Sequence, residues 1–265
     1  MFGIVALVGV GVWLKQTANP IALLLAFMLA ASLAYVPGMI WVLGLFVLWQ
    51  WKTIDHVFKK RLWMVSVGGL LLLAALVPLG LAIYKDPELA KVMAGLPAAG
   101  WPQPLTVLKN LLDVPMQLIL RGPMMPEHWL GRLPILDAFS LAMLALGGYL
   151  YTKHLKLPRV HALAATFLAT MALVALGGNI TVTLVVPFVY ILVAVGVDFL
   201  LDRWYMVFPR NIIAQTVGVV LVSVALVATA WYGIRHYYVA WPNAPETKQI
   251  FTIPEQTATS GTIKQ

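Results

Sequence analysis

Basic, acidic and histidine side chains gather in one short stretch of the sequence, from Arg121 to Asp137. The guanidinium groups of Arg121 and Arg132 have the geometry that binds a lipid-linked phosphate through paired hydrogen bonds. His128 lies between them, and Glu127 and Asp137 are candidates for general acid or base. The stretch therefore predicts a site for a phosphate-bearing molecule. An internal network of salt bridges that holds a loop against the helix ends is the alternative.

No other motif in the sequence specifies a cofactor or a metal. The chain contains no cysteine, which excludes disulfides, thiolate catalysis, iron–sulfur clusters and cysteine-ligated zinc. Glycine-rich nucleotide loops and the HExxH zinc motif are also absent. The other histidines lack the spacing of metal ligands, and we interpret them as interfacial side chains: His56, His154, His161 and His236. We expect neither a cofactor nor a metal.

The composition places this stretch in a membrane protein. Of the 265 residues, 61% are hydrophobic and only 11% are charged, and the mean hydropathy is +0.88. A soluble core cannot bury that much apolar surface. The net charge of +8 would suit nucleic acid, but the basic residues lie between apolar runs, which indicates membrane topology instead. We predict an all-α polytopic bundle with six to eight spans, which contacts membrane lipid and binds no nucleic acid.

Eight apolar segments approach the length of about 20 residues that crosses a hydrocarbon core as a helix. The five longer segments are Leu62–Tyr84, Leu133–Tyr151, His161–Gly177, Ile180–Leu201 and Ile212–Gly233. The three shorter segments are Phe2–Leu14, Pro20–Tyr35 and Gly38–Trp51. For the first of these a signal peptide is the alternative, although no basic residues precede it and its cleavage site is poor.

Pro37 and Gly38 separate the second short segment from the third. Proline disfavours helix in the residue before it, so this pair predicts a tight reversal of the chain. One long kinked helix without a reversal is the alternative, because proline kinks are tolerated within membrane helices.

Basic residues in four loops predict the orientation. If every segment crosses the membrane once, the basic residues of all four loops lie on the same side of the membrane. They are Lys15, the basic residues from Lys52 to Arg61, those from Lys153 to Arg159, and Arg203 with Arg210. The positive-inside rule makes that side cytoplasmic in a prokaryotic inner membrane and puts both termini outside. The predicted parts are N-terminal membrane helices (1–84), an external loop (85–132), C-terminal membrane helices (133–241) and a polar external tail (242–265).

Ionisable residues are nearly absent from the predicted spans, which disfavours a proton pump or a charge-relay transporter. The exception is Asp198, close to the cytoplasmic end of its segment. We expect it to form a local ion pair with Arg203 or Arg210.

Two helices are expected within the external loop. The run Asp86-Pro87-Glu88 is typical of a helix start and predicts a short helix through Met93. From Leu105 to Leu120 apolar and polar residues take opposite sides at helical spacing. This pattern predicts an amphipathic helix that lies on the bilayer and is bent or split at Pro115.

Several phrases together resemble a known family. They are Ser32–Trp41, His128–Asp137, Gly177–Pro187, Phe208–Asn211 and Tyr237–Pro242. These phrases are similar to the C-terminal membrane half of bacterial GT-C glycosyltransferases, the polytopic enzymes related to protein O-mannosyltransferases and aminoarabinose transferases. The resemblance covers most of the chain and implies a polyprenyl-phosphate sugar donor, an acceptor at the external face and an inverting transfer at the membrane boundary.

The chain departs from that family in its acidic residues. The family carries an acidic catalytic motif in its first external loop, whereas here no Asp or Glu precedes Asp55. No residue matches the catalytic base, so the catalytic residues stay unknown. Three interpretations remain open: a split enzyme whose second membrane chain supplies the acidic half, a degenerate scaffold, or a structural or interaction subunit of a membrane complex.

Overall fold

The computed structural model describes residues 2–17, 19–60, 62–97, 100–123, 129–130, 133–177 and 180–251. All regular secondary structure in these residues is helical, which confirms the predicted all-α class. The helices are α1 Phe2–Thr17, α2 Pro20–Leu33, α3 Met39–Lys60, α4 Leu62–Lys85, α5 Glu88–Ala94, α6 Pro104–Ile119, α7 Ala138–Lys153, α8 Pro158–Ala175, α9 Val186–Val207, α10 Ile212–Arg235, α11 Trp241–Asn243 and α12 Pro245–Phe251. A 3₁₀ turn, η1 (Val182–Leu184), precedes α9, and a π-helical turn, η2 (His236–Ala240), follows α10.

Each of the eight predicted segments forms a helix, but they differ in length and polarity. In the described residues four helical stretches are long and apolar enough to cross a membrane: Leu62–Lys85, Pro158–Ala175, Val182–Val207 and Ile212–Asn243. The apolar parts of α1 and α2 are shorter. Helix α3 carries Lys52, Asp55, Lys59 and Lys60 in its second half, and α7 has 16 residues. These lengths and compositions define the fold as that of a multi-pass helical membrane protein.

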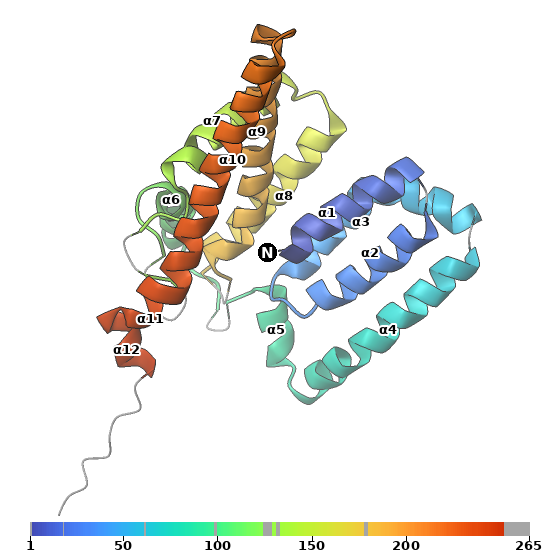
Figure 1. Ribbon diagram of the computed structural model, residues 1–265. Helices are drawn as coiled ribbons and strands as arrows, with labels where there is room; N and C mark the ends of the chain where they lie inside the picture. The colour runs from blue at the N-terminus through green and yellow to red at the C-terminus, as the bar shows by residue number, and fades with distance from the viewer. Residues whose placement is uncertain are drawn as a thin grey trace, which may run out of the picture.

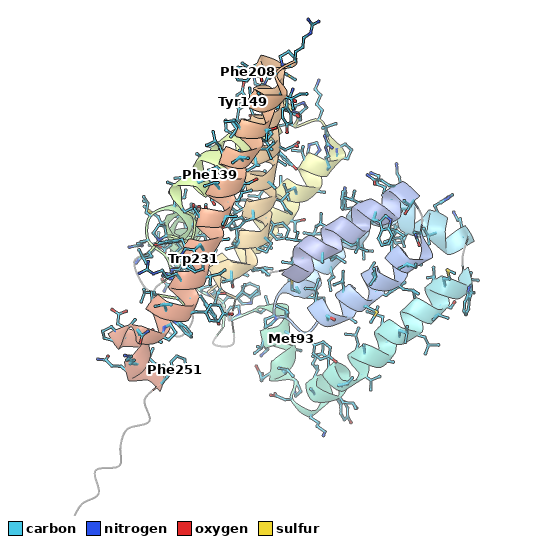
Figure 2. All side chains as sticks on the ribbon, viewed as in Figure 1. Met93, Phe139, Tyr149, Phe208, Trp231 and Phe251 are labelled. Atoms are coloured by element: carbon cyan, nitrogen blue, oxygen red, sulfur yellow. The ribbon has the colours of Figure 1, made fainter. Side chains whose placement is uncertain are left out.

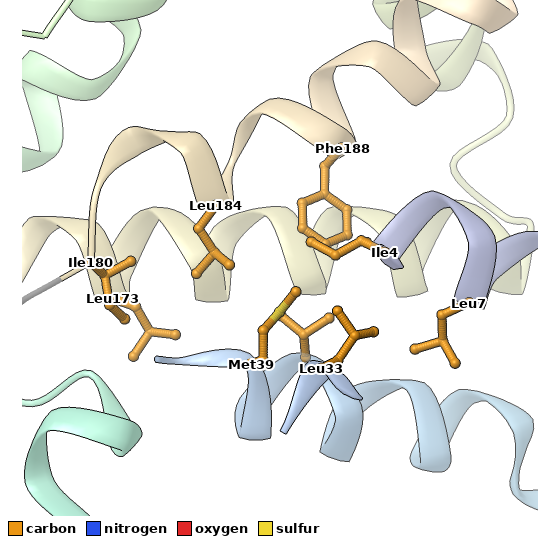
Figure 3. Packing of buried hydrophobic residues seen from close by; sticks show 9 residues of the cluster. Ile4, Leu7, Leu33, Met39, Leu173, Ile180, Leu184 and Phe188 are labelled. Carbon is orange, nitrogen blue, oxygen red and sulfur yellow. The ribbon is translucent and has the colours of Figure 1, made fainter. Parts of the chain in front are cut away.

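Successive long helices run in alternating directions and form two groups (Figure 1). One group contains α1 to α4, and the other contains α6 to α10. In the second group α7 packs along α9, and α6 packs against α8. A shared core of buried side chains joins the two groups and includes Ile4, Leu7, Met39, Leu184 and Phe188 (Figure 3).

The chain reverses at Pro37 and Gly38, as the sequence predicted. Gly38 has a φ of 78°, a left-handed conformation that suits glycine, and its N–H donates to the Met93 carbonyl at 2.8 Å. A Cβ atom at Gly38 would lie 2.4 Å from Cδ1 of Ile180. The turn after α2, the end of α5 and the start of the α9 segment therefore meet. We call this end of the bundle, where α6 also lies, the α6 end.

Two glycines let α7 and α9 approach closely. A Cβ atom at Gly147 would lie 1.9 Å from the Leu192 carbonyl oxygen, and one at Gly196 would lie 2.0 Å from that of Met143. By contrast, a Cβ atom at Gly148 would meet nothing within 4 Å. Small residues thus bring the two backbones together, as is common between membrane helices.

Three local expectations need correction. The segment predicted from Leu133 becomes helical only at Ala138, because Asp137 caps α7 by accepting a hydrogen bond from the Ser140 amide at 3.1 Å. Helix α6 is continuous through Pro115 and is not split. In the described chain Asp198 forms no ion pair, and Arg203 lies over the Phe199 ring instead. Residues five apart on one continuous helix do not face each other, unlike residues three or four apart.

Candidate functional site

Helix α6 presents three different faces at its end of the bundle. One face is buried against η1 and α9 through Val114 and Leu118. A second face is an exposed apolar stripe formed by Leu105, Leu108, Leu112, Met116 and Ile119. Between them runs a polar row at intervals of four residues, formed by Lys109, Asp113, Gln117 and, just past the helix end, Arg121. A helix with this division of faces suits the boundary between hydrocarbon and water.

Helix α6 is also held by a side-chain hydrogen bond. The Asn110 amide Nδ2 donates to the Ala175 carbonyl oxygen at 3.0 Å, at the point where α8 ends. This bond satisfies one of the carbonyl groups that a helix end leaves without a partner. It therefore holds α6 against the carboxyl end of α8.

The predicted phosphate ligand Arg121 forms an ion pair within the polar row. Its Nη2 donates to Oδ1 of Asp113 at 2.5 Å, and Nε2 of Gln117 donates to the other carboxylate oxygen at 2.6 Å. The hydrogen bonds from Gln117 and then Arg121 hold the pKa of Asp113 below its usual value, although partial burial opposes them. About half of the Arg121 side chain stays exposed. A guanidinium group has five N–H donors, so one ion pair leaves donors for a second anion.

The candidate acid Asp137 uses both carboxylate oxygens in contacts within the protein. Oδ1 accepts from the Ser140 amide at the start of α7, and Oδ2 accepts from the Thr229 hydroxyl of α10 at 2.7 Å. The carboxylate thereby connects the beginning of α7 with the side of α10. This position gives Asp137 a structural function.

Three candidates, Glu127, His128 and Arg132, lie outside the described residues. The chain on either side of them is described, and its two sides pair with each other. The Leu136 amide donates to the Leu118 carbonyl at 3.0 Å, and the Gly122 amide donates to the Leu133 carbonyl at 2.8 Å. Residues 118–122 and 133–136 thus lie side by side, with Arg121 in the first of these segments and Asp137 directly after the second.

An aromatic contact that the sequence did not predict connects Trp129 with the end of α10. Nε1 of Trp129 donates to the Leu133 carbonyl at 2.9 Å, and the indole lies 5.0 Å from the ring of His236. His236 begins the π-helical turn η2 and stacks on Tyr232. Its Nε2 atom is buried and has no hydrogen-bond partner among the described residues. π-Turns within helices are frequent at functional sites, but their position has no simple sequence signature.

The remaining side chains at this end do not assemble a metal centre. The described residues hold no group of three or more His, Asp or Glu side chains that is suited to a metal ion. The described part of the site is therefore an amphipathic helix with one half-exposed arginine, set against the end of a membrane bundle. No family model, curated protein or solved structure matches the chain.

Proposed function

We propose that the chain is a lipid-binding membrane subunit that resembles one half of a GT-C glycosyltransferase and is not catalytic by itself. Its ligand is a polyprenyl-phosphate sugar, bound at the α6 end. The observation that supports this most is the exposed apolar stripe of α6 beside the polar row that ends at Arg121. An apolar surface with a cation at one end suits such a lipid, whose phosphate is attached to one end of its apolar chain.

Each part of the ligand has a counterpart on α6. The isoprenoid chain lies along Leu105, Leu108 and Leu112, whose exposed side chains otherwise contact only bilayer lipid. The phosphate accepts hydrogen bonds from Arg121, with Lys109 one step further along the polar row. Lys109 and Arg121 give the row two positive charges against the single negative charge of Asp113, which favours an anion.

The acidic residues at this end support a subunit that needs a partner for catalysis. An inverting transfer requires a base that accepts a proton from the acceptor hydroxyl. Of the described candidates at this end, Asp113 is a weak base because hydrogen bonds from Gln117 and Arg121 lower its pKa, and Asp137 is occupied by Ser140 and Thr229. A carboxylate from a second membrane chain is the base in this proposal.

Binding of a polyprenyl phosphate to the purified protein in nanodiscs tests the proposal, with the corresponding polyprenol as the ligand that lacks phosphate. We expect Arg121→Ala to weaken binding of the phosphate form about tenfold and to leave the polyprenol unaffected, because a charge-assisted hydrogen bond is lost. Arg210→Ala, at an exposed arginine far along the chain, is the matched control.

A double variant separates binding from folding. Asp113→Asn with Arg121→Gln removes both members of the ion pair, so that neither is left as an unpaired ion. If this double variant bound the phosphate form as tightly as the unchanged protein, the assignment of Arg121 would be wrong.

One observation favours the alternative of a structural or interaction subunit. Helix α10 exposes a hollow of about 480 Å³ lined by Val220, Ser223, Val224, Val227, Ala228 and Trp231. Trp231 lies toward the α11 end of this helix (Figure 2). A helix from a partner protein would fit such a hollow, in which the small residues Ser223 and Ala228 lie among larger apolar side chains. Purification in mild detergent distinguishes the two: a stable protein partner without bound lipid phosphate favours the subunit.

A further inference from the structure

A cavity lies between the two helix groups, away from the α6 end. It measures about 550 Å³, within the range of roughly 300–1,000 Å³ that ligand pockets have. Its walls come from α1, α3, α8 and α9 and are mostly apolar. Ile4, Leu7 and Phe188 are buried side chains of the core that also line this cavity (Figure 3).

Both charged side chains that line the cavity, Lys15 and Arg159, come from helix ends. Lys15 and Gln16 come from the end of α1, Tyr151 comes from the end of α7, and Arg159 comes from the first turn of α8. Lys15 and Gln16 thus line the same cavity as Tyr151 and Arg159, which lie at least 135 positions later in the chain, and all four are at or near the predicted basic loops. The cavity is therefore amphipathic, with an apolar interior and a cationic edge.

Among the residues that the structure describes, none provides a counterion for the positive charge at this edge. No Asp or Glu lines the cavity, and neither Lys15 nor Arg159 forms an ion pair within the described part of the chain. Asp55, on the neighbouring helix α3, is engaged by Lys59 at 2.8 Å. The amino end of α8 adds the partial positive charge of its helix dipole beside Arg159. Two cations beside an apolar chamber are stabilised by an anion that also has an apolar part.

We propose that this cavity binds an anionic phospholipid from the surrounding leaflet. Its phosphate lies between Lys15 and Arg159, and one acyl chain enters the chamber toward Leu7 and Phe188. The planar guanidinium of Arg159 binds two phosphate oxygens, and the ammonium of Lys15 acts as a point charge. The Gln16 amide and the Tyr151 hydroxyl are placed to bond the rest of the headgroup. This site is separate from α6 and does not depend on the proposed function.

The experiment measures binding of phosphatidylglycerol and of phosphatidylcholine to the purified protein by native mass spectrometry. We expect phosphatidylglycerol to bind preferentially, and Lys15→Gln and Arg159→Gln each to weaken it about tenfold. Lys153→Gln and Arg203→Gln are the controls, because these cations lie near the carboxyl ends of α7 and α9 but do not line the cavity. Equal binding of the two lipids, or equal losses in the control variants, would overturn the proposal.

A second set of measurements tests the apolar chamber. Ala162→Phe places a ring inside the cavity and is expected to abolish phosphatidylglycerol binding while Arg121-dependent binding at the α6 end persists. Inorganic phosphate at millimolar concentration should not displace the lipid, because most of the contact is made by the acyl chain. Displacement by inorganic phosphate, or unchanged lipid binding in Ala162→Phe, would show that the chamber does not hold the chain.

Discussion

The hydroxyl group of Thr229 donates a hydrogen bond to Oδ2 of Asp137, 92 residues earlier in the chain, at 2.7 Å. The same carboxylate caps α7 through the Ser140 amide. Within the described chain, α10 otherwise packs mainly on α9 and on its own continuation η2. One aspartate therefore begins a helix and fixes the side of another.

Loss of this bond is expected to destabilise the bundle. Thr229→Val keeps the shape of the side chain but leaves a partly buried carboxylate without one donor, which costs roughly 1–3 kcal/mol. Thr216→Val is the matched control on the same helix, because the Thr216 hydroxyl donates only to the Ile212 carbonyl one turn earlier. Thermal unfolding in detergent measures both, and equal midpoints for the two variants would contradict a tie between α10 and Asp137.

The glycine contact between α7 and α9 makes a second prediction. Gly147→Ala forces the α9 backbone away, since its Cβ would lie 1.9 Å from the Leu192 carbonyl oxygen. We expect a loss of roughly 1–3 kcal/mol from this overpacking. The adjacent Gly148→Ala meets no atom within 4 Å and should be neutral or stabilising by up to about 1 kcal/mol through helix propensity. Chemical unfolding of both variants in the same detergent measures this difference. If Gly147→Ala were more stable than Gly148→Ala, the close approach of α7 and α9 would be disproved.

The ion pair of Asp113 predicts a dependence on pH. Its pKa lies below the ordinary value of 3.8 in the folded chain, because Gln117 and Arg121 bond the ionised form. The stabilisation is therefore complete above the ordinary pKa and disappears as the pH falls through the lower folded pKa. Asp113→Asn should lower the unfolding midpoint at neutral pH and make little difference at a pH below the folded pKa. Asp55→Asn, which removes an exposed helical pair, should have a small effect at neutral pH.

Much of the fold was predictable because its signals are local. The apolar runs, the helix start at Asp86 and the reversal at Pro37 and Gly38 each depend on neighbouring residues. The range predicted for α6 differs from the observed one by a single residue at each end. The late start of α7 was not predicted. The apolar residues from Leu133 onward are typical of a membrane helix, but the backbone groups of Leu133 and Leu136 form hydrogen bonds with Gly122 and Leu118, at the end of α6.

The candidate site was predictable only in part, because several of its side chains interact with residues that are distant in the sequence and that no sequence motif marks. Asp113, Gln117 and Arg121 follow the four-residue spacing of one helix face, so the ion pair of Arg121 with Asp113 could have been predicted from the sequence. The bond between Asp137 and Thr229 and the approach of Lys15 to Arg159 depend on tertiary packing of separate helices. No periodicity in a single sequence reveals either pair.

Cysteine labelling tests the central claim most directly: the helices cross a membrane, with the basic loops and the α6 end on opposite faces. The chain has no cysteine, so every engineered thiol is unique. With a membrane-impermeant maleimide on intact cells, we predict that Asp86→Cys and Gln103→Cys react and that Lys156→Cys and Arg210→Cys react only after lysis. Labelling of Lys156→Cys in intact cells to the same extent as Gln103→Cys would contradict this arrangement.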